Sequence, residues 1–411
     1  MKRPPPSRFR RLWALAPGTI FLNHGSFGAC PKAILDLQTG LRRQMEAEPV
    51  QFLWRRYEEL LEPARRAVAQ FVGASSKDLV FVTNATTGVN SVMRSLRFKA
   101  GDEILTTSHD YNACRNVLAE VAARSGARLV VASVPFPLAS EDEVVEAVLG
   151  CVTARTRLAM IDHVTSNTAL IFPIARLVQE LEARSVDTLV DGAHAAGMLP
   201  LDLNQLGAAY YTANLHKWTC APKGAAFLWA REDKQDGLQP AVISHGNNRP
   251  RAGFTRFQDR FDWAGTFDVT PWLCVPHAID FMGSLLNGGW PELRKHNHDL
   301  VIKARGLLGE MLDVTAPCPE TMLGSMATLP LPEKFQRRPV HGKTAHLAHK
   351  VDSPLPKIDH EQLRLYDQYG VEVPLMRIGE PVRRCFRISA QVYNTIHEYE
   401  HFGKALLDLE A

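Results

Sequence analysis

Two residues that could do chemistry each follow a short apolar run of the sequence. Asp191 closes the run Thr188-Leu189-Val190, and Lys217 comes shortly after the run that ends at Tyr211. The amine of a lysine can form a Schiff base with an aldehyde. A carboxylate can keep a pyridine nitrogen protonated, so that the ring withdraws electrons from a substrate Cα. The pair therefore predicts an enzyme that uses pyridoxal 5'-phosphate (PLP), with Lys217 and Asp191 as catalytic residues.

Three other polar segments also follow apolar runs. Segment 83–88 (TNATTG) would open a helix with hydroxyls and free backbone amides, which suit a phosphate. An aromatic ring at His109 or Tyr111 could stack on a planar cofactor, and Asn167 could donate a hydrogen bond to a phenolate oxygen. The sequence also leaves ordinary roles open for these segments, as helix caps, a surface histidine or turn residues. Asp191 could likewise be an ordinary helix N-cap residue.

Short apolar runs alternate with longer amphipathic segments from residue 79 to residue 230. The runs predict strands, and the segments between them predict helices. The predicted strands are 79–82, 103–106, 129–132, 158–161, 188–190, 208–211 and 224–230. This alternation indicates an α/β fold with a mainly parallel seven-stranded sheet and helices on both faces. In such a sheet ligands bind where strands end and helices begin, which is where the polar segments lie.

The rest of the chain divides into an arm and a second unit. We expect residues 1–30 to form an extended N-terminal arm, because Pro4-Pro5-Pro6 disfavours a helix. We expect residues 31–275 to form the large domain. It would begin with a helix that ends near Pro49 and a second helix after it. Within this domain, the stretch 245–265 is rich in Gly, Asn, Arg and Pro and predicts a long loop. Residues 276–411 predict a smaller C-terminal α+β domain.

Composition and charge argue against several classes of protein. The 411 residues are 45% hydrophobic and 22% charged with a net charge of +3, which predicts neither a nucleic-acid nor a membrane-surface partner. The seven cysteines are scattered without a CxxC pair. We therefore expect no disulfides and no metal site, and a reducing, cytoplasmic setting. The apolar stretch 12–22 is interrupted by Pro17 and Gly18, so it predicts no membrane span or signal segment.

Five groups of residues form an ordered set of motifs between residues 20 and 400. They are Phe21-Leu22-Asn23-His24-Gly25-Ser26-Phe27-Gly28; Asp191-Gly192-Ala193-His194; His216-Lys217-Trp218; Gly265-Thr266 with Pro271-Trp272; and Arg387-Ile388-Ser389 with Tyr393-Asn394-Thr395. In this order they resemble the class V aminotransferase-like PLP enzymes of fold type I. Within that family they are similar to the isopenicillin N epimerase subgroup, whose relatives include C–S lyases. The resemblance implies the PLP-dependent transferase fold of type I and PLP as the cofactor.

The resemblance also implies a role for each matching residue. It implies that Lys217 forms the Schiff base and moves the Cα proton, and that Asp191 pairs with the pyridine nitrogen. It implies that His109 stacks on the ring, with Tyr111 as the alternative. The other implied cofactor residues are His194 and Asn167 on the ring-oxygen side, and Ala85, Thr86, Asn214 and His216 at the phosphate.

Two further implications concern the substrate and the assembly. Arg387 is implied to bind the substrate α-carboxylate, because a guanidinium can form two parallel hydrogen bonds with it. Asn23 and His24 are the other substrate-binding residues that we expect. Thr266 is implied to reach the phosphate of a neighbouring subunit, and we therefore expect a homodimer.

Two departures from the family patterns bear on the reaction. Cysteine desulfurases of this superfamily carry a nucleophilic cysteine before the carboxylate-binding arginine, and here Val371 stands at that place. Cys385 is too close to Arg387 to replace it, so the sequence disfavours a persulfide-forming desulfurase. The epimerase subgroup often lacks an asparagine at the position of Asn167, whereas desulfurases and lyases usually have one.

The sequence as a whole predicts an epimerase or racemase that acts at the Cα of an amino acid, or of the amino-acid end of a peptide. Lys217 would remove the Cα proton, and a second group on the opposite face would return one. Tyr111 and His24 are both open for that second role. A C–S lyase or a class V aminotransferase could use the same residues. A non-catalytic protein is disfavoured by the joint presence of Lys217, Asp191 and Arg387.

Overall fold

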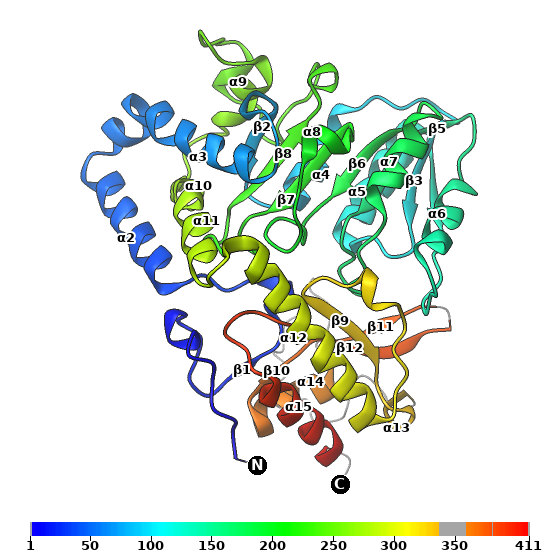
Figure 1. The fold of residues 1–411 in the computed structure, drawn as a ribbon. Coiled ribbons are helices and arrows are strands. Elements are labelled where there is room, and N and C mark those ends of the chain that lie inside the picture. The colour runs from blue at the N-terminus through cyan, green and yellow to red at the C-terminus, as the bar shows by residue number, and fades with distance from the viewer. Residues whose placement is uncertain (1, 337–358, 380, 410–411) are drawn as a thin grey trace.

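The structure is a computed structural model, and it describes residues 2–336, 359–379 and 381–409. These residues form a large sheet with its helices, shown in the upper part of Figure 1, and a smaller three-stranded sheet below it. The N-terminal segment reaches both parts, because β1 (Ile20–Phe21) pairs with β10 (Val371–Glu372) and α3 (Tyr57–Phe71) packs near the large sheet.

Seven strands form the large sheet, in the order β2-β8-β7-β6-β5-β3-β4. They are β2 (Leu79–Val82), β3 (Glu103–Thr107), β4 (Arg128–Ala132), β5 (Thr156–Asp162), β6 (Asp187–Asp191), β7 (Tyr210–Asn214) and β8 (Ala226–Ala230). Neighbouring strands are parallel except for β8, which is antiparallel to β2 and to β7. The predicted mainly parallel seven-stranded sheet is confirmed.

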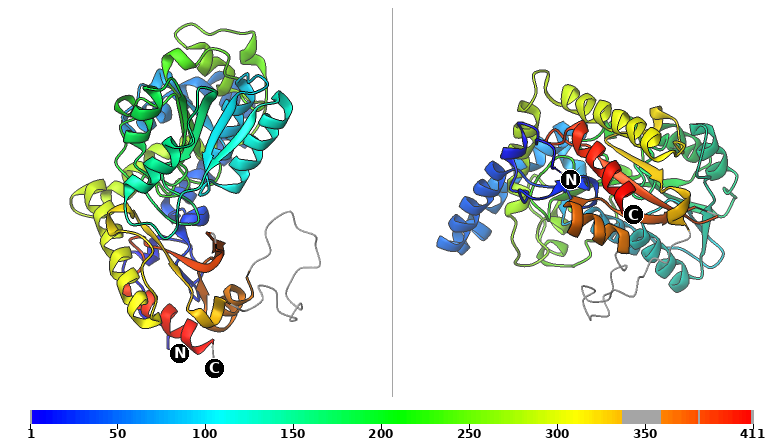
Figure 2. Two further views of the ribbon diagram at one scale, coloured as in Figure 1. Left: turned by 90° about the vertical axis from the view of Figure 1, so that its right-hand side faces the viewer. Right: turned by 90° about the horizontal axis from the view of Figure 1, so that it is seen from below.

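Helices cover both faces of this sheet. They include α4 (Ala85–Ser95), α5 (Asn112–Ser125), α6 (Glu141–Leu149), α7 (Ile174–Glu182), α8 (Leu203–Leu206) and α9 (Arg256–Asp262). Because side chains alternate along a strand, Val80 and Met160 pack with α4, α5 and α9, whereas Phe81 and Ile161 pack with α3, α6 and α7. Figure 2 (left) shows the sheet between its two helical layers.

The smaller unit is an antiparallel sheet with helices beside it. Its elements are β9 (Met326–Pro330), β11 (Leu375–Ile378), β12 (Arg383–Ser389), α12 (Gly289–Leu312), α13 (Glu333–Gln336), α14 (His360–Tyr369) and α15 (Ile396–Asp408). The strand order is β11-β12-β9, and α12 lies along α15 (Figure 1). Two shorter helices, α10 (Thr270–Leu273) and α11 (Val275–Ser284), connect the large unit to α12. The boundary at residue 275 stays a prediction.

The N-terminal segment is attached to the rest of the molecule at several points. After β1 come α1 (His24–Phe27) and α2 (Lys32–Ala47). The Ile20 N–H donates to the Gly370 carbonyl across the β1–β10 pair. A π-helical turn at Gln51–Arg55 separates α2 from α3, close to the predicted break at Pro49.

The prediction that residues 245–265 form one long loop is wrong in part, because α9 lies within them. Thr255 and Gln258 form a capping box at its start, and Phe257 and Phe261 bury one side of it. Both signals are local, as a capping box and an apolar i,i+4 pair usually are. The Gly- and Pro-rich residues before the helix obscured them.

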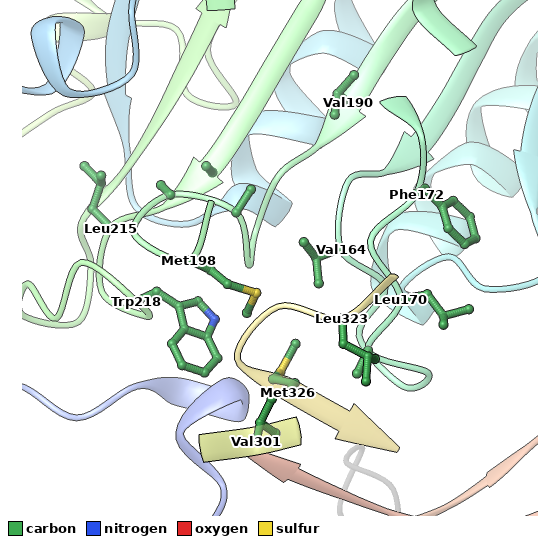
Figure 3. Close-up of a cluster of buried hydrophobic side chains, with 14 of the residues drawn as sticks. Val164, Leu170, Phe172, Val190, Met198, Leu215, Trp218, Val301, Leu323 and Met326 are labelled. Atoms are coloured by element: carbon green, nitrogen blue, oxygen red, sulfur yellow. The ribbon is translucent and has the colours of Figure 1, made fainter. Parts of the chain in front are cut away.

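A cluster of apolar side chains joins the two units near the ends of β6 and β7. Met198 and Trp218 lie on loops of the large unit and face Met326 at the start of β9 (Figure 3). Leu170 and Leu323 form an isolated β-bridge beside them. These contacts hold the loop that carries Lys217 against the small sheet.

Three further features concern the setting of the chain. In the parts of the chain that the structure describes, no helix is long and apolar enough to cross a bilayer. All seven cysteines are free thiols. Within the same residues, no group of three or more His, Cys, Asp and Glu side chains is placed to hold a metal ion.

Candidate active site

The ends of three neighbouring strands bring the first part of the site together. Asp162 ends β5, Asp191 ends β6, and Asn214 ends β7. Asp162 pairs with Asp191, and Asp191 pairs with Thr212 of β7. Because these strands are parallel, the predicted polar residues meet at one edge of the sheet.

Lys217 lies in a tight turn after β7 that two glycines make possible. A Cβ on Gly28 would lie 2.1 Å from the His216 carbonyl oxygen, and a Cβ on Gly197 would lie 2.6 Å from the Trp218 carbonyl carbon. Both glycines have positive φ, a region that other residues rarely adopt. The Nε2 atom of His24 lies 3.1 Å from the Lys217 carbonyl oxygen. The turn is therefore enclosed by segments far apart in the chain.

The amine of Lys217 meets His194. Its Nζ atom lies 3.0 Å from His194 Nε2, and Trp218 Nε1 lies 3.4 Å from His194 Nδ1. Because an indole N–H can only donate, Nδ1 is an acceptor and a neutral ring carries its hydrogen on Nε2. That hydrogen can then be donated to the lone pair of a free amine. The contact favours Lys217 in its uncharged, nucleophilic form.

Burial and nearby charges act on Lys217 in the same direction. Burial lowers its pKa to about 7, with a further contribution from the positive charge of Arg387, while Asp191 and Asp162 oppose the shift. Burial and the charge of Lys217 also lower the pKa of His194, well below its ordinary value. An amine with a pKa near 7 is available as a nucleophile and as a base at neutral pH.

Two hydrogen-bond donors hold the Asp191 carboxylate. It accepts hydrogen bonds from the Ala193 N–H at 2.9 Å and from the Cys114 thiol at 3.2 Å. Among the described residues it forms no ion pair within 4 Å. Burial raises its pKa, opposed by these two hydrogen bonds and by the charge of Lys217. A buried carboxylate in this state is suited to an external cation.

The N-terminus of α4 lies beside the end of β7. The Ala85 N–H donates to Asn214 Oδ1 at 2.9 Å, and Asn84 caps the helix by accepting from the Thr87 N–H. In the described part of the chain, the Thr86 hydroxyl has no hydrogen-bond partner. The Nδ1 atom of His216 lies 3.0 Å from the Ala225 carbonyl oxygen, and its Nε2 atom has no hydrogen-bond partner among the described residues. Of the four predicted phosphate residues, Ala85 and Asn214 are thus joined directly.

Arg387 crosses from β12 of the small sheet to the large unit. It donates to Ser26 Oγ at 2.9 Å, to Asn23 Oδ1 at 3.4 Å and to the Ser166 carbonyl. The side chain is buried, its Nε has no partner, and no carboxylate pairs with it among the described residues. Burial lowers its pKa to about 10. An unpaired buried guanidinium next to Lys217 is a site for an anion.

The two candidates for stacking are placed differently. Both ring nitrogens of His109 are occupied, by Thr168 Oγ1 at 2.7 Å and by the Val134 carbonyl at 3.1 Å, and Phe136 and Phe172 flank the ring. Tyr111 is the N-cap residue of α5, half exposed. Burial raises its pKa, with added contributions from Cys114 and Asp191. Asp191 is thus the smallest of the three contributions to the raised pKa of Tyr111.

The remaining predicted residues fall into two groups. Asn23 is brought to Arg387, and His24 lies beneath Lys217 with its Nδ1 2.8 Å from the Tyr393 hydroxyl. Burial lowers the pKa of His24 to about 3. Asn167 is exposed in the loop whose Ser166 carbonyl meets Arg387, while its own carbonyl accepts from Thr328. Thr266 is exposed in the segment before α10, and none of the contacts described above involves it.

Sequence reasoning missed three residues of the site. Ser26 and Ser166 hold Arg387, and Asp162 stands beside Asp191. Asp162 could have been noticed, because it closes an apolar run just as Asp191 does. Ser26 lies in a motif that was recognised, but its partner is 361 residues away.

These residues fit PLP on their own chemistry. A free amine, a carboxylate without a cationic partner and a helix N-terminus are the three groups needed for its aldehyde, its pyridine nitrogen and its phosphate. Lys217, Asp191 and Thr86 supply them within one edge of the sheet.

Comparison with known proteins decides the family. The family model described as Aminotransferase class-V matches residues 32–338. The chain belongs to the class V aminotransferase family. PLP as the cofactor and the fold type I architecture, both predicted from the sequence, are confirmed.

Proteins that are similar to this chain carry different reactions in their names. Isopenicillin N epimerase from Amycolatopsis lactamdurans is 35% identical over 410 residues, covering 96% of each chain. A putative L-cysteine desulfhydrase from Oryza sativa subsp. japonica is 32% identical, covering 96% of this chain and 84% of the other. The structure of C-DES with glycine linked to its PLP cofactor aligns with a TM-score of 0.78 at 20% identity, covering 97% and 99%. The family and the cofactor are thus shown, and the reaction is the subject of the proposal that follows.

Proposed function

We propose that this chain is an epimerase or racemase that inverts the Cα of an amino acid, or of the amino-acid end of a peptide. The observation that carries the proposal is the position of Arg387. It is a buried cation that pairs with no carboxylate of the described residues, and its charge lowers the pKa of Lys217. A substrate α-carboxylate would complete Arg387 with charge-assisted hydrogen bonds. Its Cα would then lie near the Lys217 amine.

Each residue of the site has a distinct task in this proposal. PLP, when bound, holds the substrate nitrogen and withdraws electrons from Cα. Asp191 holds the pyridine nitrogen, and Thr86 with the start of α4 and His216 holds the phosphate. Lys217 takes the Cα proton with its free amine, and His194 keeps that amine oriented.

Inversion also requires a proton donor on the face opposite Lys217, and we assign this role to Tyr111. Its pKa responds to Asp191, and it starts the helix whose Cys114 contacts that carboxylate. A tyrosine ring there can also stack on the cofactor, a role that we transfer from His109. His24 is a poor donor, because its two nitrogens contact Tyr393 and Lys217 and burial holds its pKa at about 3.

A C–S lyase is the second candidate. It is supported by the cysteine desulfhydrase relative and by Asn167, exposed beside Arg387. Elimination needs Lys217 but no donor on the opposite face. A persulfide-forming desulfurase is less well supported, because Val371 is fully buried in β10 and Cys385 is buried in β12.

We further propose that the enzyme is a homodimer in which Thr266 completes the phosphate site of the neighbouring subunit. Size measurement of the PLP-loaded enzyme, compared with Thr266→Ala, tests this idea. A monomer that binds PLP with full affinity would contradict it. A cytoplasmic setting, predicted from the cysteine pattern, is part of the same proposal.

The experiment that tests the reaction is proton NMR of the PLP-loaded enzyme with a panel of L-amino acids, L-cysteine and small thiol-bearing peptides in heavy water. Loss of the α-proton signal together with the opposite stereoisomer supports epimerisation. Release of a keto acid and a sulfur fragment without inversion would reject it in favour of the lyase.

Tyr111→Phe is the variant that separates these two reactions. We expect it to slow inversion by about 10²–10⁴-fold, the usual contribution of a general acid, while Lys217 still exchanges the α-proton with solvent. Tyr366→Phe, which alters a similarly exposed tyrosine on α14, is the control. If Tyr111→Phe inverts substrate at the wild-type rate, the assigned donor is wrong.

A further inference from the structure

The site contains a second buried carboxylate that neither the sequence motifs nor the proposed reaction uses. Asp162 ends β5 and pairs in register with Asp191 at the end of β6. Each is 3% exposed. Residues paired across two parallel strands point their side chains to the same face, here the face covered by α4 and α5. The two carboxyl groups are therefore neighbours in a low-dielectric interior.

The hydrogen bonding of the two carboxyl groups is unequal. Asp191 accepts from the Ala193 N–H and from the Cys114 thiol, which favour its charged form. The Oδ1 atom of Asp162 is buried and has no hydrogen-bond partner within the part of the chain that the structure describes. An ionised carboxylate with an orphaned buried oxygen is strongly disfavoured.

The charges that face Asp162 come from four elements. Asp191 lies on β6, Asp110 on the loop after β3, Cys114 and Arg115 on α5, and Lys217 on the loop after β7. Arg115 forms an ion pair with Asp110 at 2.5 Å, so its charge is already balanced. Burial is the first cause that raises the pKa of Asp162, followed by the charges of Asp191 and Asp110, while Lys217 and Arg115 oppose it.

Two adjacent buried carboxyl groups with one nearby amine cannot both ionise without a large cost, so such pairs hold one proton between them. We propose that Asp162 is a positioning residue for the cofactor: a neutral carboxylic acid that shares a single negative charge with Asp191. The pair then presents one negative charge to one protonated pyridine nitrogen. This inference rests on the confirmed cofactor and is independent of whether the reaction is epimerisation or elimination.

The proposal determines how stability changes with pH. A carboxyl group with a raised pKa in the folded state stabilises the fold fully below its unfolded pKa of about 3.9, and this contribution is lost as pH rises through the folded pKa. Between these values the folded chain keeps one proton that the unfolded chain releases. Asp162→Asn is neutral at every pH and removes this dependence.

The first test is urea unfolding of the full-length PLP-loaded protein at pH 5.5 and pH 7.5. One retained proton changes the folding equilibrium constant tenfold per pH unit. We therefore expect the constant of Asp162→Asn, relative to wild type, to rise by up to about a hundredfold between the two pH values. The same ratio at both pH values would overturn the proposal. Asp187→Asn, at the other end of β6, measures the loss of a carboxylate paired with Lys234 instead.

The second test separates a neutral acid from a charged partner of the cofactor. We expect Asp162→Asn to change the Kd for PLP by less than about threefold, because asparagine mimics the neutral acid, whereas Asp191→Asn should weaken binding by more than about tenfold. Equal weakening by the two variants would show that Asp162 is charged, contrary to the proposal.

A third measurement needs no variant that must fold. Infrared spectra of the wild-type holoenzyme should show the carbonyl band of a protonated carboxylic acid at pH 7.5. Its absence would refute the proposal. None of the three readouts requires turnover, so their failure is distinct from failure of the proposed epimerase reaction.

Discussion

Two arginines on β12, three residues apart, are both buried but have opposite surroundings. Arg384 lies 2.7 Å from Asp359 and 2.5 Å from Glu361 and donates to the Phe335 carbonyl. Among the described residues, Arg387 has only neutral oxygens as partners. The hydrogen bonds and charges of Asp359 and Glu361 raise the pKa of Arg384 against the effect of burial, whereas burial alone lowers that of Arg387.

This difference distinguishes a structural cation from a functional one. The spacing of three residues sends the two side chains to opposite faces of the strand. One face belongs to the small unit, which supplies its own acids. The other face carries Arg387 toward Lys217. There the positive charge of Arg387 lacks a carboxylate partner among the described residues, and an anionic ligand can supply one. A buried charge that lacks a partner is costly, so its retention points to a function.

The strongest test of this comparison is Lys217→Ala, because it removes the amine that Arg387 faces. We expect the rate to fall about 10⁴-fold, the upper range for a proton-transferring group, and the visible absorbance of bound PLP to be lost. Steady-state kinetics and absorbance spectra measure both. Lys223→Ala is the control, since Lys223 lies in the same connection between β7 and β8 but is exposed and donates to the Gly28 carbonyl. A persistent visible band in Lys217→Ala would exclude Lys217 as the attachment point.

The comparison is tested directly by replacing each arginine with glutamine. Arg384→Gln leaves Asp359 and Glu361 buried without their cation, and we expect it to lower the free energy of unfolding by about 3–5 kcal/mol. Arg387→Gln should change it by less than about 1 kcal/mol, because no carboxylate is left behind. Urea unfolding of both variants gives the numbers. Equal destabilisation would contradict the distinction.

For substrate binding we expect the larger effect from replacing Arg387, the arginine whose replacement should change stability less. We expect Arg387→Gln to raise KM about 30- to 150-fold, corresponding to loss of about 2–3 kcal/mol from a charge-assisted bidentate contact. Steady-state kinetics with substrates that carry or lack the α-carboxylate measure how much the contact with Arg387 contributes to substrate binding. Arg383→Gln, an exposed residue on the same strand, should leave KM unchanged. An unchanged KM in Arg387→Gln would remove the carboxylate assignment.

The smallest expected effect is a shift in pH dependence. The free amine of Lys217 attacks PLP, so the rate at which PLP attaches to the cofactor-free chain should rise tenfold per pH unit below pH 7 and level off above it. Arg387→Gln removes a charge that lowers this pKa, and the midpoint should therefore move to higher pH. Stopped-flow absorbance follows the attachment. A midpoint that stays the same or moves to lower pH would argue against electrostatic coupling of the two residues.

Much of the large unit could be predicted because its signals are local. Each strand is a short apolar run, and Asp191 and Lys217 stand at fixed distances from such runs. Strand periodicity and strand ends are set by neighbours in the chain. The helix α9 was also locally encoded, through Thr255 and Gln258, and was missed because the glycines and prolines before it dominated the interpretation.

The roles of two site residues could not be read from such local signals. The sequence offered His109 before Tyr111 for stacking and left His24 open as a proton donor. In the structure, the ring nitrogens of His109 make hydrogen-bond contacts with Thr168 and Val134. Those of His24 make hydrogen-bond contacts with Tyr393 and Lys217. Whether a histidine faces a cofactor or a carbonyl depends on packing between segments that lie from 25 to 369 residues apart in the chain.

The sequence by itself determined the α/β architecture, the family and the identity of the cofactor, because short motifs and apolar periodicity encode them. Only the tertiary structure decided which buried charged side chains lie next to a group of opposite charge. Arg384 and Arg387 differ by their position on two faces of one strand, and Asp162 meets Asp191 only because β5 lies beside β6 in register. Electrostatic energy depends on distance and burial in three dimensions, and neither follows from spacing along the chain.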